Sequence, residues 1–307
     1  MSSLRLAMLI TLIYACRVLP LMADCQTPGF SSTELLELRA NGFEVEDDVT
    51  RNVLAVALAA CTSEPDPKIR DGVAFEGLST WLRAGALSPE TVSTLRVELG
   101  EQLGNTGNSA GDANGFRQPF AALILSEVVR TDRVEPVFTT EQRAELVEIA
   151  AAYLASVNDY RGFSETDGWR HGVAHGADLV LQLVLNPNIN AEQIMVLMDA
   201  VARQVSPPDA VFYIYGEPAR LARAVFYAYI RGVVGQTYWA NWFQGVSSPT
   251  PMDSWSDAFS TQAGLAKRHN SLAFLSAMYL NASTWDEPGS TDLSELLEKS
   301  IRAVLSG

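Results

Sequence analysis

The fold of this chain is decided by the stretch DGWRHGVAHGADLVLQLVL, residues 167–185. It contains two of the three histidines of the chain and then becomes a continuous apolar run. In a helix over this stretch, His171, His175 and Asp178 share one face, at positions i, i+4 and i+7. The spacing therefore predicts a buried helix that carries a polar group near its start.

The same pattern of a polar opening followed by an apolar run returns along the chain. The segments that show it are RDGVAFEGL, RQPFAALIL, RHGVAHGAD, RLARAVFYA and RHNSLAFLS, which begin at Arg70, Arg117, Arg170, Arg220 and Arg268. Successive arginines are separated by 47, 53, 50 and 48 residues. Helix pairs of this length stack because none can bury its apolar face alone. The sequence predicts an all-α fold of helical hairpin repeats of about 50 residues, a HEAT-like α-solenoid; the alternative is a closed α/α toroid.

Apolar periodicity and capping residues predict the individual helices, and no segment shows the alternation typical of a strand. The predicted helices cover residues 33–40, 47–60, 66–84, 88–103, 116–130, 140–157, 167–185, 191–205, 217–232, 265–280 and 292–305, and the Gly/Asn-rich run 104–115 is predicted to be a loop. The domains expected are an export signal at 1–23, an N-terminal arm with short helices at 24–65 and a helical-repeat domain at 66–307.

The N-terminus has the composition of an export signal. Arg5 precedes an apolar segment, Leu6–Ala15, that is too short to span a bilayer as a lasting anchor. Cleavage after Ala23 would give an exported or periplasmic protein, and a lipoprotein anchored at Cys16 is the alternative. A buried N-terminal helix is a third interpretation. Contact with a membrane is expected only through the signal or the lipid anchor.

Composition limits the partners. The formal net charge of -14 excludes a chain that binds nucleic acid through a broad basic surface. After removal of the signal, Cys25 and Cys61 form an even pair in an oxidising compartment, so a disulfide between them is reasonable.

The recurrent arginines allow two interpretations. An arginine in the first turn of a helix opposes the helix dipole and needs a partner. The simpler interpretation is a ladder between stacked helices, with Asp66, Asp71, Asp167 and Glu217 as nearby acids. The other is a ligand groove along which the helix starts display arginines and histidines.

The candidate binding residues lie at these helix starts. They are Trp169, Arg170, His171, His175, Asp178, Glu217, Arg220, Arg223, Arg268 and His269. His171, His175 and His269 are candidate ligands of a divalent metal, although the HExxH pattern of metalloproteases is missing. The alternative is that these histidines bond carboxylates or backbone carbonyls. No nucleotide-binding or nucleophile-elbow motif is present, so no cofactor other than a metal is expected.

An aromatic cluster at Tyr238, Trp239, Trp242 and Phe243 is a second candidate contact surface, because such side chains stack on sugars or peptides.

Several short motifs follow one another between residues 71 and 275. They are DGVAF with Trp81, FRQPF, RGF, GWRH, AHGAD, GEP, RLAR and RHNSL with Phe274 and Leu275. In this order they resemble the bacterial domain-of-unknown-function family 2785. The resemblance covers roughly residues 66–280, departs at Gly172, where alanine is expected, and implies no established activity.

Two functions therefore remain open. The first is an exported binding scaffold for a peptide, a protein or an anionic or saccharide ligand. The second is a hydrolase or lyase that acts on a cell-envelope glycan or peptide through a pocket of histidine, arginine and glutamate, with or without a metal.

Overall fold

The computed structural model describes residues 25, 27–104 and 114–306. The predicted export signal at 1–23, the alternative anchor Cys16 and most of the predicted loop at 104–115 lie outside these residues. None of the described helices is both long and apolar enough to cross a membrane.

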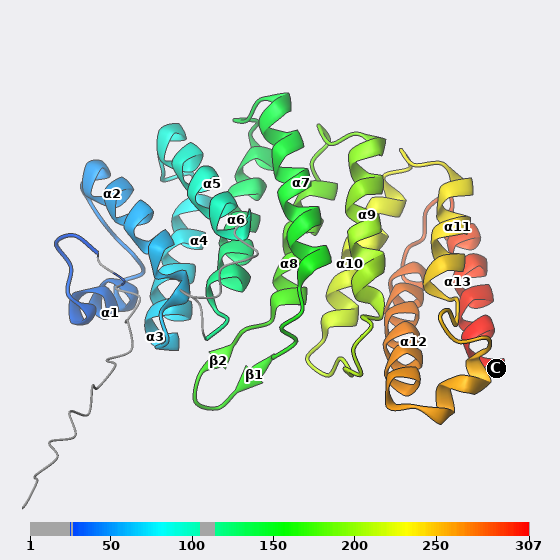
Figure 1. The fold of residues 1–307 in the computed structure, drawn as a ribbon. Helices are drawn as coiled ribbons and strands as arrows, with labels where there is room; N and C mark the ends of the chain where they lie inside the picture. Colours follow the sequence, from blue (N-terminus) through cyan, green and yellow to red (C-terminus); the bar gives the residue numbers. More distant parts are fainter. Residues whose placement is uncertain (1–24, 26, 105–113, 307) are drawn as a thin grey trace, which may run out of the picture.

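The helices form two layers, and the chain alternates between them (Figure 1). The first layer contains α3 (Pro67–Ile69), the π-helical turn η2 (Arg70–Phe75), α4 (Glu76–Arg83), α6 (Arg117–Val134), α8 (Gly172–Val184), α10 (Glu217–Ile230) and α12 (Gln262–Ser283). The second contains α2 (Asp48–Ala59), α5 (Pro89–Gly104), α7 (Thr140–Ser156), α9 (Ala191–Val205), α11 (Gln236–Val246) and α13 (Ser290–Leu305). The short helices α1 (Ser32–Ala40), η1 (Ala60–Ser63) and η4 (Trp255–Ser260) complete the helical part.

Each helix contacts the next helix of its own layer and the neighbouring helix of the other layer. In Figure 1 the helices α1 and α2 lie at one end of the array and α12 and α13 at the other. The described helices thus form an open row, and they do not close into the alternative α/α toroid. The all-α prediction is confirmed, apart from one short hairpin.

That hairpin corrects the prediction of a helix starting at Asp167. Strands β1 (Phe163–Ser164) and β2 (Gly168–Trp169) pair antiparallel, and α8 begins only at Gly172. The Ser164 hydroxyl accepts a hydrogen bond from the Asp167 amide at 3.0 Å, which favours a turn. Gly168 adopts φ 74°, a left-handed conformation in which a helix cannot continue.

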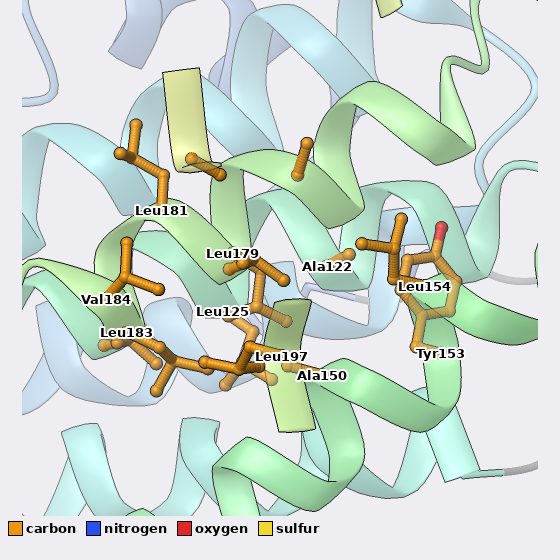
Figure 2. Close-up of a cluster of buried hydrophobic side chains, with 14 of the residues drawn as sticks. Ala122, Leu125, Ala150, Tyr153, Leu154, Leu179, Leu181, Leu183, Val184 and Leu197 are labelled. Atoms are coloured by element: carbon orange, nitrogen blue, oxygen red, sulfur yellow. The ribbon is translucent and has the colours of Figure 1, made fainter. Parts of the chain in front are cut away.

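The core is continuous from the first helices to the last, and α8 lies in the middle of it. Leu179, Leu181, Leu183 and Val184 of α8 pack against apolar side chains of α6, α7 and α9 (Figure 2). A helix with apolar residues on most of its surface must be enclosed on several sides. The apolar run after Asp178 therefore positions the helix, and with it the polar residues near its start.

The turns of successive hairpins are joined to one another by polar side chains. Asp132, at the end of α6, accepts hydrogen bonds from the amides of Val137 and Phe138 at 2.9 and 2.8 Å. Arg143 of α7 donates two more, both at 2.8 Å, and Asn186 of the following turn donates another at 2.8 Å. One carboxylate therefore fixes the α6–α7 turn and ties it to the α8–α9 turn.

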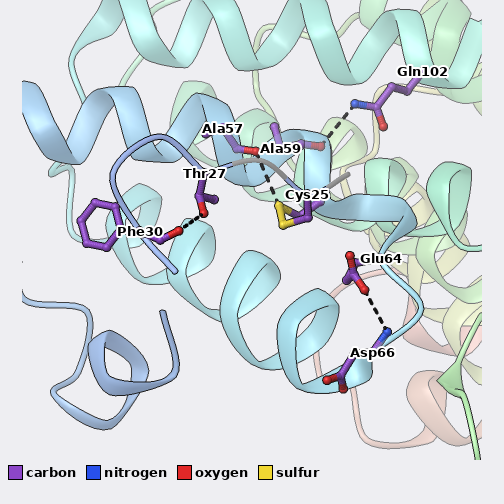
Figure 3. The surroundings of a disulfide bond; sticks show 9 residues. Cys25, Thr27, Phe30, Ala57, Ala59, Glu64, Asp66 and Gln102 are labelled. Carbon is purple, nitrogen blue, oxygen red and sulfur yellow. Dashed lines mark hydrogen bonds between the residues drawn. A yellow bond between two sulfur atoms is a disulfide. The ribbon is translucent and has the colours of Figure 1, made fainter. Parts of the chain in front are cut away.

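The next hairpin repeats this arrangement with an arginine. Arg231, after α10, donates to the carbonyl oxygens of Val184, Asn186 and Ile189 at 2.8 to 3.0 Å. These carbonyls belong to the end of α8 and the α8–α9 turn, so the segment after α10 is bonded to the α8–α9 turn as that turn is bonded to the α6–α7 turn. At the N-terminal end the predicted disulfide between Cys25 and Cys61 is present (Figure 3).

Candidate functional site

The β1–β2 hairpin positions His171 beside Trp169. The His171 backbone is left-handed, with φ 60°, and forms the N-cap of α8. Its ring stacks on the Trp169 indole at 4.8 Å between centroids and meets the ring of His175 edge-on at 5.7 Å. A non-glycine residue seldom adopts this conformation, so the hairpin and α8 together impose it.

His175 is a buried contact between α8 and α6. It is 8% exposed, its Nδ1 lies 3.1 Å from the carbonyl oxygen of Pro119, and its ring packs edge-on against Phe120. Burial, and then the neighbouring His171, lower the pKa of His175 to about 3. The ring is therefore neutral at physiological pH and serves the packing of the two helices.

His171 is less buried and differs in its hydrogen bonding. Burial, and then the nearby Arg220 guanidinium, lower the pKa of His171 to about 4, and the polar backbone of Tyr215 has a smaller, opposite effect. Its Nε2 is shielded from solvent and has no hydrogen-bond partner among the described residues. The His171 imidazole is therefore neutral at physiological pH.

Asp178, two turns along α8, pairs with Arg220 of α10. Burial raises the pKa of Asp178, and the positive charges of Arg220 and Arg223 oppose this rise. The structure thus brings His171, Asp178, Arg220 and Arg223 into one neighbourhood on the first layer of helices.

Two other candidates have structural roles. Glu217, the first residue of α10, is buried, accepts a hydrogen bond from the Tyr215 amide at 2.9 Å and has its pKa raised by burial. Arg170 donates to the carbonyl of Asn114 at 2.7 Å and lies over the Phe116 ring. Both side chains hold loops in place, so neither presents its charge to a ligand.

The last two candidates belong to a different part of the array. His269 of α12 is exposed, with Nε2 3.4 Å from the Tyr213 carbonyl and its ring against Phe212. Arg268 lies over Phe259 of η4. No three His, Cys, Asp or Glu side chains in the described part of the chain are grouped to hold a metal. His269 is therefore not grouped with His171 and His175 as the third ligand of a metal, because its ring contacts the loop before α10.

Polar pairs do link neighbouring helices of the first layer, but mostly through residues other than the aligned arginines. The links are Arg83 to Glu127, Arg133 to Gln182 and Arg220 to Asp178. Of the acids expected as ladder partners, Asp167 pairs with Arg170 in its own segment and Asp71 with its neighbour Arg70. The register of a helix face, which the alignment of helix starts does not give, decides which side chains meet.

The aromatic cluster after α10 is also different from the expectation. Trp239 and Phe243 are fully buried, and the Trp242 indole donates a hydrogen bond to the Met198 carbonyl at 3.0 Å. The rings of Trp239, Trp242 and Phe243 fill the interface of α11 with α9, α10 and α12. These three side chains are therefore core residues and offer no stacking surface.

A groove of about 630 Å³ lies between α10 and α12, and no local sequence pattern predicts it. It is lined by Ala219, Arg220, Arg223, Phe226, Tyr227, Ile230, Ala277, Leu280, Asn281, Thr284 and Trp285. The helical spacing of Phe226, Tyr229 and Ile230 predicts core packing, and Tyr229 is buried, whereas Phe226 and Ile230 are half-buried and line this groove. These side chains lie beside Leu280, which is 66% exposed. The sequence does not show that this part of the helix pair is left uncovered.

A family model described as "Protein of unknown function (DUF2785)" matches residues 103–280, more than half of the chain. The matched part extends from the end of α5 to α12 and includes the hairpin, the histidine pair and most of the groove. Comparison with curated proteins and with solved structures gave no match. The chain therefore belongs to the DUF2785 family.

Proposed function

We propose that this protein is an exported helical-repeat scaffold that binds an amphipathic, negatively charged ligand in the groove between α10 and α12. The alternation of helices between two layers and the bonds between successive turns support the HEAT-like repeat interpretation. The Cys25–Cys61 disulfide supports export, because structural disulfides persist in oxidising compartments.

The groove carries this proposal. Its volume of about 630 Å³ lies within the range of ligand-binding clefts. One part is lined by Arg220 and Arg223, and the other by aromatic and aliphatic side chains. A few charged groups beside an apolar wall are the usual composition of a binding site, since the wall supplies the affinity and the charges supply the orientation.

Local charge selects an anion in spite of the acidic chain. Arg220 is paired with Asp178, whereas Arg223 makes no ion pair within the described residues. These three groups together leave one positive charge beside the groove. An anionic group at this position gains a charged hydrogen bond, while a cation would meet two guanidinium groups.

The test uses 8-anilinonaphthalene-1-sulfonate, an aromatic anion whose fluorescence rises in an apolar site. We expect saturable binding to the folded protein and loss of this binding in Leu280→Glu, which places a negative charge in the groove. Ile214→Glu is the matched control, because Ile214 is 71% exposed and lies outside the groove. Equal binding to both variants and to wild type would reject the groove as the ligand site.

The hydrolase or lyase alternative has less support. It requires His171, Arg223 and Glu217 to face one substrate, but the Glu217 carboxylate accepts a hydrogen bond from its own loop. Among the described residues, the unpartnered Nε2 of His171 is the feature that favours acid–base chemistry. An enzyme would lose turnover of an envelope glycan in His171→Gln without losing binding of the fluorescent anion.

A further inference from the structure

We infer that the ligand of this groove is a short extended peptide segment of a partner protein, about five residues long, with an acidic side chain at the arginines and apolar side chains beyond them. The inference rests on the proposed function and names its ligand.

The length of the groove sets the number of residues. The lining residues of α10 run from Ala219 to Ile230, which corresponds to about 16 Å along a helix axis. An extended chain advances roughly 3.3 Å per residue, so about five residues span this distance. Alternate side chains of such a segment point to the same side, so about three of the five enter the groove.

The backbone of an extended peptide needs hydrogen-bond partners, and Asn281 can supply them. Its side chain lines the groove on the α12 side and makes no hydrogen bond to another described residue. A primary amide carries both a donor and an acceptor, so one asparagine can bond the carbonyl and the amide of a single ligand residue. The neighbouring Thr284 hydroxyl is already bonded to the Leu280 and Asn281 carbonyls.

The exposure of the groove distinguishes a peptide from an acyl chain. Leu280 is 66% exposed, and Arg220 and Arg223 are exposed as well, so a ligand here keeps one side in water. An acyl chain would leave much of its methylene surface hydrated and gain little from burial. A peptide with alternating side chains can bury its apolar side and leave its polar side in solvent.

The order of the side chains follows from the lining. Arg220 and Arg223 lie in the first half of α10, whereas Phe226, Ile230 and Trp285 lie toward the other end, where the Phe226 and Trp285 rings meet edge-on at 5.9 Å. An acidic side chain is thus expected at the arginine end, and a leucine or phenylalanine between the aromatic rings and Leu280.

The experiment measures binding of acetylated and amidated pentapeptides by titration calorimetry. The probes are Glu-Ser-Leu-Ser-Phe, its reverse sequence, and the versions with glutamine in place of glutamate. Of the forward and reverse glutamate peptides, we consider the one that binds more tightly. Its affinity should fall about fivefold when its glutamate is replaced by glutamine, and also when the protein carries Arg223→Gln, because an exposed ion pair contributes up to about 1 kcal/mol. The control Arg203→Gln removes an exposed arginine of α9 outside the groove and should leave affinity unchanged.

A second series tests the extended backbone. N-methylation of the central leucine should weaken binding about fivefold, as expected for one hydrogen bond of roughly 1 kcal/mol. In Asn281→Ala the same methylation should have no further effect, because the two changes remove one contact. Additive losses would reject the role of Asn281.

The outcomes separate the inference from the proposed function. In one outcome, dodecanoate or the fluorescent anion binds, Leu280→Glu reduces this binding, and none of the peptides binds. The groove is then a ligand site and the peptide inference is wrong. Peptide binding that Leu280→Glu does not reduce would also overturn the inference. If neither peptides nor anions bind, both proposals fail.

Discussion

Replacement of Asp132 by asparagine tests whether the bonded turns hold the helical array together. The Asp132 carboxylate is 1% exposed and accepts five hydrogen bonds, from the two turn amides, Arg143 and Asn186. Asparagine has nearly the same shape, but its amide group presents hydrogen atoms to donors and it carries no charge. Arg143 would remain in the interior as an uncompensated cation.

The expected cost follows from the buried pair. Removing one partner of a buried, hydrogen-bonded ion pair destabilises a protein by about 3–5 kcal/mol. Arg143→Gln should cost less, because the carboxylate keeps its bonds to Val137, Phe138 and Asn186. Asp48→Asn is the control: its carboxylate is 80% exposed and pairs with Arg51 at the surface, so its removal should change stability by about 1 kcal/mol or less.

The assay is urea unfolding followed by far-UV circular dichroism. We expect Asp132→Asn to be less stable than Arg143→Gln, and both to be less stable than Asp48→Asn. An unfolding free energy of Asp132→Asn within about 1 kcal/mol of wild type would refute the reasoning, because a structural role of the carboxylate requires a larger loss.

The pH dependence of Asp132 gives an independent check. Burial raises the pKa of this carboxyl, but the hydrogen bonds from Arg143, Phe138, Val137 and Asn186 outweigh burial and hold the pKa below its usual range. The folded state then binds a proton less readily than the unfolded state, whose aspartates titrate near about 3.9. Its stabilisation is present above this pH and is lost as the pH falls through the lower folded pKa. Asp132→Asn should flatten the stability profile in that acidic window.

Two further predictions concern the histidines and the disulfide. The pKa values of His171 and His175, about 4 and about 3, lie below the ordinary value of about 6.5, so the unfolded state binds more protons and stability should fall as the pH drops from about 6.5 toward 4. NMR titration of the imidazole signals checks this, and a midpoint near 6.5 would contradict the burial of these rings. Cys25→Ser opens a bridge between residues 36 apart and should lower the unfolding free energy by about 3–4 kcal/mol. The reduced wild type should match this variant in urea, and unchanged stability of both would show that the bridge does not stabilise the fold.

The sequence by itself determined the helices that have a strong apolar period and a cap. Asn190 with Gln193 predicted the start of α9, and the structure shows this capping box. The start of α10 was predicted from a different local signal, Pro218, because proline is favoured in the first turn of a helix. Such signals depend on side chains within a few residues of each other, so local chemistry is enough to predict them.

The candidate site was predicted in part. The contact between His171 and His175 followed from their spacing along one stretch. The β1–β2 hairpin did not, because the left-handed backbone of Gly168 and His171 is stabilised by contacts of the hairpin with Tyr215 and the start of α8. The position of His269 away from the pair depended on the loop before α10, which no local pattern describes.

Tertiary structure alone decided which side chains meet between helices. The pairing of Arg220 with Asp178 joins residues 42 apart, and Asn186 reaches Asp132 across 54 residues. Whether an apolar helix face is covered depends on the neighbour that packs against it, so Trp239 is buried while Leu280 remains exposed beside the groove. The periodicity of a sequence gives the face of each helix, but the rotation and offset of neighbouring helices come from packing of the whole array.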